Sequence, residues 1–311
     1  MPINTLEFAR ITQTELDRQV EVEATSGWME LNSSRVRYNG GNEVKIPILD
    51  MDGMGDYDRD NGFTQGSVNL KWQTRTLTQD RGRTFLLDAM DVDETAFVAT
   101  ASSVMSEFQR RQVIPEIDSY RYSSIASQAI EKSKATTGYT PTGADIITKL
   151  RSDIYKIYDI AGEIPLIITM SMPVAAVLEN NTEIAKYMDT VNFTHGNINT
   201  KVRSFNGIPI MKVPSSRMKT KYVFYDGKTA GDGDSEPDQT KGGFAAAEDA
   251  KDINWIISAQ DTAIAVSKTE KIRVFAPDVN QKADAWKLDY RKYHDLWILD
   301  NQFDKIIVNT K

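Results

Sequence analysis

The chain has 311 residues, of which 40% are apolar and 26% charged, and its net charge of −7 corresponds to a pI of about 5.1. This length is enough for about two domains with a proper hydrophobic core, and the acidic balance argues against a protein that binds nucleic acid mainly through its phosphates. The absence of cysteine excludes disulfides, thiolate metal sites and cysteine nucleophiles. No apolar run approaches the roughly 18 residues of a membrane span, so we expect no membrane partner.

Residues 1–35 carry few apolar side chains for their length. The positions that fit a short helix are Leu6, Phe8, Ile11 and Leu16. The segment also lacks the basic head and the apolar block of a secretory signal. We therefore expect an arm that lies on another surface rather than a domain of its own.

Residues 36–79 have the pattern of a long β-hairpin. In the first strand, RVRYNGGNEVKIPILDM, apolar and polar residues alternate, and Pro47 indicates an edge position or a bulge because it cannot donate to a neighbouring strand. In the return strand, GSVNLKWQTRTLTQ, the residues that point to one side are Val68, Leu70, Trp72, Thr74 and Thr76. An acidic, glycine-rich tip joins the strands. Because a two-stranded ribbon is only marginally stable in water, a partner or another sheet of the chain, as in an ordinary sandwich, must supply the missing contacts.

Residues 94–112 have the pattern of a long helix. Its apolar stripe consists of Phe97, Ala101, Val104, Met105 and Phe108. Glu107 and Arg111 lie four residues apart, the spacing of a weakly favourable ion pair. We expect the helix to end at Pro115, because the residue before a proline disfavours helical backbone, and we expect a second, short helix to follow.

Residues 135–226 alternate helical and strand patterns, which indicates an α/β domain. The run EIPLIITM (163–170) is typical of a buried strand, and Gly162 is placed to end the helix before it. Residues 227–252 are rich in glycine, aspartate and small residues, so we expect a mobile loop there. Residues 253–311 contain five strand-like runs, which predicts an antiparallel β region.

No motif for catalysis, nucleotide binding or metal binding is complete. The segment Gly227-Lys228-Thr229 lacks the earlier glycine of a phosphate-binding loop. The tip segment DYDRDNG (56–62) matches the first ligand positions of a calcium loop but lacks its turn glycine and closing glutamate. The two histidines are too few for a multi-histidine zinc site. The arginine pairs at 81 and 83 and at 110 and 111 are typical of solvated or ion-paired side chains rather than of nucleic-acid contacts. We expect no cofactor and no enzymatic activity.

The order of the predicted parts is distinctive: an arm, a long hairpin, a long helix, an α/β region and a β-rich end. Three segments stand out within this order, namely EFQRRQVIPEIDSYRYSSIA (107–126), NGIPI followed by VPS (206–215), and DYRKYHDLW (289–297). In the order and in these segments the chain resembles the major capsid proteins of tailed bacteriophages, which have the α+β Hong Kong 97-type fold. The resemblance covers nearly the whole chain as an order of elements.

The resemblance implies a division of the chain into functional parts. These would be an N-terminal arm (1–35), an extended hairpin loop (36–79), a peripheral domain with a spine helix (80–134), an axial α/β domain (135–226), a mobile loop (227–252), and strands that complete both domains (253–311). It also implies hexamers and pentamers that close into an icosahedral shell around double-stranded DNA, which is packaged without sequence-specific binding. The hairpin would lie across the neighbouring subunit.

The implied partners are further copies of the chain, a separate scaffolding protein, a portal and head-decoration proteins. The implied location is the virion, assembled in the cytoplasm of the bacterial host. The family's lysine–asparagine cross-link is not matched here. The residues that we expect at the assembly interface are Val44, Ile46, Ile48, Tyr57, Phe63, Leu70, Trp72, Arg75, Glu107, Arg110 and Arg111.

Three alternatives to a phage shell remain open. A cellular nanocompartment shell of the encapsulin type has the same fold, and the sequence separates it poorly from a phage capsid. A hydrolase that uses carboxylates or a divalent ion through the acidic loops lacks any convergent motif. A β-rich binding module is disfavoured by the long helix.

Overall fold

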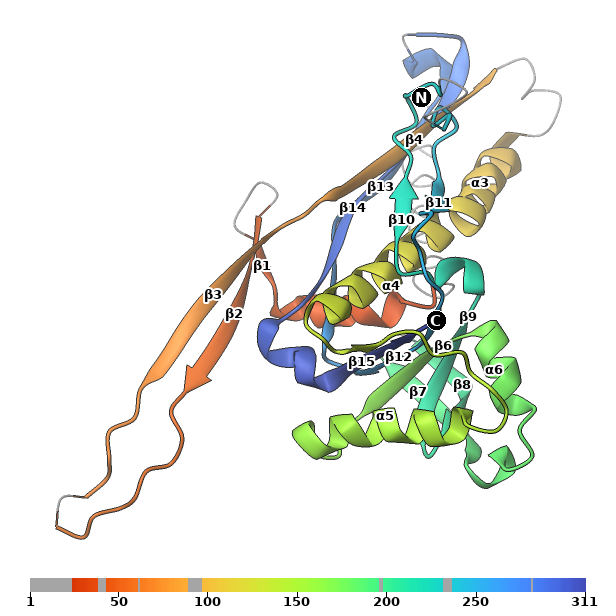
Figure 1. Ribbon diagram of the computed structural model, residues 1–311. Helices are drawn as coiled ribbons and strands as arrows, with labels where there is room; N and C mark the ends of the chain where they lie inside the picture. Colours follow the sequence, from red (N-terminus) through yellow and green to blue (C-terminus); the bar gives the residue numbers. More distant parts are fainter. Residues whose placement is uncertain are drawn as a thin grey trace.

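The computed structural model describes residues 24–38, 43–60, 62–88, 97–195, 198–231, 237–280 and 282–311. Figure 1 shows a body of packed sheets and helices and a long hairpin that projects from it. Most of the expected arm, residues 1–23, and the start of the expected long helix, residues 94–96, lie outside the described residues. Among the residues that are described, no helix combines the length and the apolar character needed to cross a membrane.

The centre of the body is a seven-stranded mixed sheet. In spatial order its strands are β5 (Ala135–Thr136), β15 (Ile306–Thr310), β12 (Ile253–Ala259), β6 (Leu166–Ser171), β9 (Ile208–Val213), β8 (Ile198–Phe205) and β7 (Met188–His195). β6 and β12 are buried at every position, which confirms the buried strand expected at EIPLIITM. Because neighbouring residues of a strand point to opposite faces, Trp255 and Ile257 enter one core and Ile256 enters another.

Helices cover both faces of this sheet (Figure 1). On one face, α5 (Ile146–Ala161) and α6 (Met172–Glu179) share a core with Trp255. α5 ends at Gly162, as expected, with a φ of 74° that favours glycine. On the other face, α4 (Ile114–Glu131) contributes Tyr122, Ile125, Ala126 and Ala129 to the core.

The long helix continues beyond its expected end. α3 (Phe97–Phe108) passes through a π-helical turn, η2 (Gln109–Val113), directly into α4. The prediction of an end at Pro115 is wrong: the N–H of Ile114 bonds to the oxygen of Gln109, and this wider turn accommodates the proline ring within the helix. The expected second, short helix is therefore the second half of one helix.

A second, three-stranded sheet is antiparallel and lies beside the long helix. Its strands are β13 (Ala263–Phe275), β14 (Ala285–Ile298) and β4 (Gln79–Asp88). The β region expected over residues 253–311 is thus confirmed, but its five runs form four strands because β13 unites two of them. Two of the four, β12 and β15, complete the central sheet instead.

Val104, Met105 and Phe108 of α3 pack on this three-stranded sheet. Phe108→Ala is expected to lower the free energy of unfolding by about 3 kcal/mol. The ring of Phe108 lies edge-on to Phe85 and Tyr290, with centroids 4.9 and 5.9 Å away, so its removal leaves a cavity between helix and sheet. Chemical denaturation measures the loss. Ser103→Ala, at an exposed position of the same helix, is the control, and a loss below about 1 kcal/mol for Phe108→Ala would contradict the packing described.

Residues 24–35 belong to the core, which corrects the expectation of a surface arm over residues 1–35. Most of the segment forms the 3₁₀ helix η1 (Gly27–Arg35). Trp28 and Met29 are each 1% exposed and pack against α4 and β13 in the main core. The short segment has no clear period, so only its tertiary contacts reveal the burial.

A buried ionic network ties this segment to the long helix. Asp118 of α4 is fully buried and accepts hydrogen bonds from the N–H and hydroxyl groups of Thr25 and Ser26, at 2.6 to 3.3 Å. Arg217 donates to the same carboxylate at 3.1 Å. The arrangement satisfies both oxygens of a charge that would otherwise be costly to bury.

Glu30 extends the network on the other side of the segment. It forms ion pairs with Arg121 and Lys292, whose side chains are 0% and 3% exposed. Burial raises the pKa of Glu30, but the two cations together outweigh it and bring the pKa from 4.5 to about 2. Because the folded-state pKa lies below the unfolded value, the pairing stabilises the fold above about pH 4.5 and this contribution is lost as the pH falls towards 2.

Part of the expected mobile loop, residues 227–252, is a strand. β11 (Phe244–Ala246) pairs antiparallel with β10 (Tyr222–Phe224). Residues 232–236 lie outside the described residues. We call β10, β11 and the described residues between them the flap.

The long hairpin has the expected return strand, whereas its first strand is split. β1 (Arg37–Tyr38) pairs antiparallel with the start of β2 (Glu43–Met51), and β2 pairs in turn with β3 (Val68–Thr76). β1 reaches only as far as Lys45, so Pro47 lies on an open edge of β2, which confirms its predicted position. β3 passes almost directly into β4, so one extended segment joins the hairpin to the three-stranded sheet (Figure 1).

Candidate assembly interface

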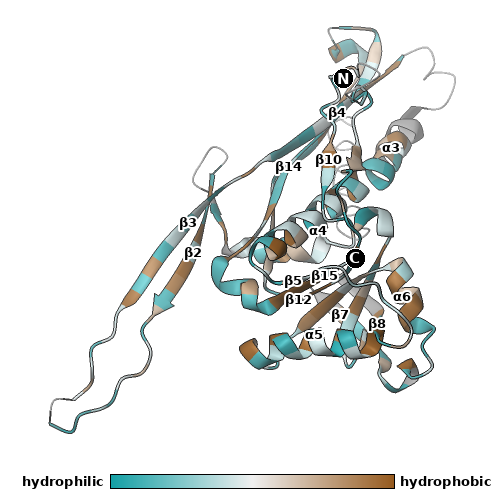
Figure 2. Ribbon diagram, in the orientation of Figure 1, coloured by the Kyte–Doolittle hydropathy of each residue, from teal (hydrophilic) through white to brown (hydrophobic). Residues whose placement is uncertain are grey.

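One face of the hairpin is apolar and exposed. Residues directly opposite each other in an antiparallel ladder point to the same face, and three successive pairs are Pro47–Trp72, Leu49–Leu70 and Met51–Val68. The five large side chains other than Pro47 keep between 43% and 65% of their surface exposed. Figure 2 shows the apolar stretches along both strands, in the part that projects from the body. We call these six residues the apolar face; a contiguous row of this kind marks an interaction surface, whereas isolated exposed residues do not.

The opposite face of the hairpin anchors it to its own chain. Val44 and Ile46 are 0% and 1% exposed, and Ile48 packs against the same cluster. The other buried members are Leu77, Ile264, Val266, Trp297 and Leu299. Val44 and Ile46 are therefore removed from the expected interface, because their own chain covers them. The alternation of the sequence shows that these residues share one face of the strand, but it does not show whether the same chain or a partner covers that face.

Beyond the paired strands, residues 52–60 and 62–67 form the tip of the hairpin. Asp52 accepts hydrogen bonds from the N–H and hydroxyl of Ser67 at 2.7 and 2.8 Å, which closes the base of the tip. Tyr57 and Phe63 pack edge to face with centroids 5.0 Å apart, yet 61% and 88% of their surfaces remain exposed. Both aromatic residues are thus accessible to a partner.

The acidic residues of the tip do not assemble a metal site. Across the described part of the chain, no three histidine, cysteine, aspartate or glutamate side chains come together as metal ligands. The incomplete calcium-loop pattern at residues 56–62 therefore gains no support from the described geometry.

A buried carboxylate ties the hairpin to the body where β3 passes into β4. Asp295 of β14 is 3% exposed and accepts hydrogen bonds from the N–H and hydroxyl of Thr78, both at 2.9 Å, and from the hydroxyl of Tyr120 at 2.5 Å. Burial and the Asp295 charge raise the pKa of Tyr120, so its hydroxyl stays protonated and donates. Because Tyr120 lies on α4, one carboxylate joins the hairpin, the sheet and the long helix. We call Asp295, Thr78 and Tyr120 the hinge clamp.

The charged residues expected at the interface lie in two separate places. Arg75 lies at the base of the hairpin, 4.0 Å from Asp300. Glu107 and Arg111 form the expected ion pair on the long helix, and Arg110 is exposed beside them. Figure 1 shows the hairpin and α3 on different sides of the body, so within one chain the structure does not bring the two sets together.

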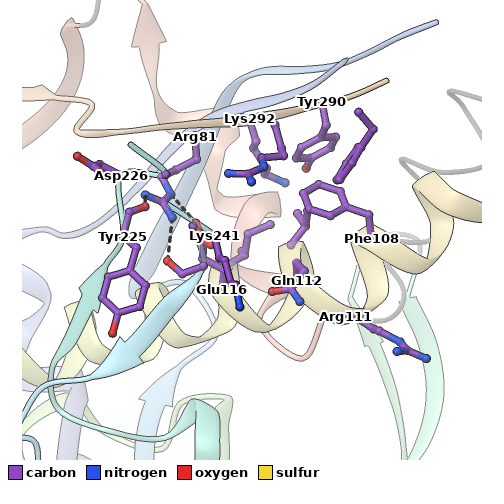
Figure 3. A pocket seen from close by; sticks show the side chains of 18 of the residues that line it. Arg81, Phe108, Arg111, Gln112, Glu116, Tyr225, Asp226, Lys241, Tyr290 and Lys292 are labelled. Carbon is purple, nitrogen blue, oxygen red and sulfur yellow. Dashed lines mark hydrogen bonds and ion pairs between the residues drawn. The ribbon is translucent and has the colours of Figure 1, made fainter. Parts of the chain in front are cut away.

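A groove of about 1090 Å³ lies between the long helix, β4 and the flap (Figure 3). Arg81 of β4 donates to Glu116 at 2.6 Å and to the backbone oxygens of Tyr225 and Gly243 at 2.7 and 3.2 Å. Arg81 therefore joins the three walls of the groove, which confirms the ion-paired role expected for it. The sequence carries no signal for this groove, since its walls come from segments far apart in the chain.

The comparisons with known proteins establish the fold. No protein-family model matches the sequence, and no curated protein is similar to it. The structure of a virus-like particle from Pyrococcus furiosus matches with a TM-score of 0.53 and 10% identity, over 97% of this chain and 98% of that chain. A chain of Microbacterium phage Oxtober96 has a TM-score of 0.52 and 9% identity, over 90% of both chains. A chain from the capsid of cyanophage P-SCSP1u has a TM-score of 0.51 and 12% identity, over 88% of this chain and 84% of that chain. The chain thus has the α+β fold of phage capsids, which confirms the Hong Kong 97-type fold class expected from the sequence.

Proposed function

We propose that the chain is the structural subunit of an icosahedral shell, the major capsid protein of a tailed bacteriophage. The observation that carries the proposal is the apolar face of the hairpin, which a single chain leaves exposed. The fold that presents this face is similar to that of a phage capsid structure. An element of this kind is stable in water only when a second surface covers it.

Contact with a neighbouring copy supplies that cover. Leu49 and Leu70 keep 53% and 55% of their surfaces exposed, and burial of the remaining half of a leucine contributes about 1 kcal/mol. The outer edges of β2 and β3 offer backbone hydrogen bonds in addition. A subunit repeated many times in a shell can therefore keep a ribbon that would be a liability in a monomer.

In this proposal the copies form hexamers and pentamers that enclose double-stranded DNA. The net charge of −7 limits non-specific binding to the packaged phosphates. A separate scaffolding protein, a portal and head-decoration proteins are the proposed partners. The proposed location is the virion, after assembly in the cytoplasm of a bacterial host, and the proposed role is structural rather than enzymatic.

A cellular nanocompartment shell is the second candidate. It is favoured by the match to the virus-like particle from Pyrococcus furiosus, which extends over nearly the full length of both chains. The nucleic acid inside purified particles separates the two functions: phage heads recovered from infected cells contain double-stranded DNA, whereas a nanocompartment shell contains none packaged to high density.

Deletion of residues 50–62 is expected to leave a folded monomer and to abolish closed particles. Residues 50–60 are exposed, and no described residue of the deleted segment belongs to the hydrophobic clusters of the body. Thermal unfolding measures the fold, and negative-stain microscopy of the concentrated protein measures assembly, with the full-length chain as the control. Closed shells from the shortened chain, or a full-length chain that stays monomeric at high concentration, would contradict the proposed function.

A further inference from the structure

His294 is buried where β14, β4 and the long helix meet. It lies on β14 with 3% of its surface exposed, opposite Gln79 of β4. The ring of Tyr120 from α4 lies edge-on to the imidazole, with centroids 5.5 Å apart. The Nδ1 atom of His294 is buried and has no hydrogen-bond partner among the described residues. The next residue, Asp295, belongs to the hinge clamp, so the imidazole lies beside the groups that attach the hairpin to the body.

Cations surround this imidazole, one from each of the three elements that meet there. They are Lys292 of β14, Arg81 of β4 and Arg121 of α4. Each is already paired with a carboxylate, and these carboxylates are Glu30 of η1, Glu116 of α4 and Glu270 of β13. Glu30 favours a charged imidazole, but two of the cations share it. A proton on His294 would therefore add a fourth cation to a site whose carboxylates are already engaged.

The charge state of His294 depends on whether this junction is closed. Burial, reinforced by the cations, holds the pKa of His294 well below its usual value of 6.5, so the ring is neutral in the folded chain. An opened junction returns the pKa towards 6.5. Because the folded-state pKa is the lower one, the stabilisation is complete above about pH 6.5 and is lost as the pH falls below it. Glu30 continues the same trend below about pH 4.5.

We propose that His294 is a pH-sensitive switch for this junction. While its ring is neutral, residues 24–35 and the root of the hairpin, residues 76–82, stay packed on the long helix and β14. As the pH falls below about 6.5, the opened form gains a proton that the closed form does not take up, and its population rises up to about tenfold per pH unit. The switch lies within a single chain, so it goes beyond the proposed shell function and does not depend on it.

The groove between the long helix, β4 and the flap brings solvent to the switch. His294 and Lys292 are both among the residues that line it, although both side chains are buried. A local opening at this level therefore exposes the imidazole without unfolding the central sheet. The proton couples to this local step, and we expect the effect of pH to be confined to the junction.

The charge of His294 can be measured directly, because the chain has only two histidines. Isotope labelling of the histidine rings gives two NMR signals, and His195→Gln identifies which of them belongs to His294. We expect the signal of His294 to keep the chemical shift of a neutral ring in the folded chain at pH 5.5. A signal that titrates with a midpoint near pH 6.5 would overturn the inference.

Hydrogen exchange, corrected for its intrinsic pH dependence, measures the opening itself. Between pH 7.5 and pH 5.5 the protection of residues 24–35 and 76–82 is expected to fall about tenfold, and that of α5 to stay unchanged.

His294→Gln is expected to remove this pH dependence, and His195→Gln, the same change at the other histidine, to keep it. The two pH values are compared within each variant, so a lower overall stability of one variant does not affect the result. His294→Leu, which keeps the site apolar, repeats the comparison as a second variant without a titrating ring. An equal loss of protection without the His294 ring, or a loss that extends to α5, would contradict the switch.

Discussion

The double substitution Leu49→Asn with Leu70→Asn is expected to abolish assembly at concentrations where the unaltered chain forms particles. The two leucines face each other in register at the centre of the apolar face. If each loses about 1 kcal/mol of burial on a neighbour, the concentration needed for assembly rises about 30-fold. Light scattering over a concentration series measures this threshold.

The fold of the monomer should be unaffected by this change, because both leucines are about half exposed in the single chain. The matched control is Asn69→Asp with Lys71→Gln, at neighbouring positions of β3 whose side chains point to the opposite side. Equal assembly thresholds for the leucine variant and this control would show that the apolar face is not the surface that neighbours cover.

The substitution Asp118→Ala is expected to lower the free energy of unfolding by about 3–5 kcal/mol, the largest effect on stability that we predict. It removes the acceptor of the N–H and hydroxyl groups of the buried Ser26 and the partly buried Thr25, and it leaves Arg217 without its ion pair. The segment that carries Trp28 then loses its attachment to α4. Denaturant unfolding, followed by tryptophan fluorescence, measures the loss.

Asp118→Asn keeps one oxygen acceptor without the charge and should cost less than the alanine variant. Asp159→Ala, at an exposed position of α5, should change the free energy of unfolding by less than about 0.5 kcal/mol. A similar, small effect of Asp118→Ala and Asp159→Ala would mean that residues 24–35 are not held in the core by this carboxylate.

The sequence predicts the hairpin well because its signal is local. Alternation fixes which residues of each strand share a face, and it places Leu70 and Trp72 together correctly. It does not determine which face the body covers, because that depends on Trp297 and other residues more than 200 positions away. For this reason the sequence analysis names Val44 and Ile46, which their own chain buries, and does not name Leu49 and Met51, which it leaves exposed.

The predicted end of the long helix and the predicted surface position of residues 24–35 are wrong for different physical reasons. The rule that a helix ends before proline is a preference of the preceding residue, and here Ile114 keeps α-helical backbone, with φ of −61° and ψ of −48°, directly after the π turn. Trp28 and Met29 lie in a short segment without periodicity, so their burial follows only from the cavity between α4 and β13 that they fill. The groove, built from four distant segments, has no local pattern at all.

The hinge clamp has a mechanical consequence for a shell. Between Thr78 and the tip the chain is extended over about 50 Å. A small rotation at Thr78 therefore produces a larger displacement at the tip. A tilt of about 5° at the buried carboxylate of Asp295 displaces the far end by about 4 Å over this length. In the proposed shell, uniform curvature among many subunits would therefore depend on the rigidity of this attachment, which the hinge clamp shares with the buried cluster around Val44 and Ile46.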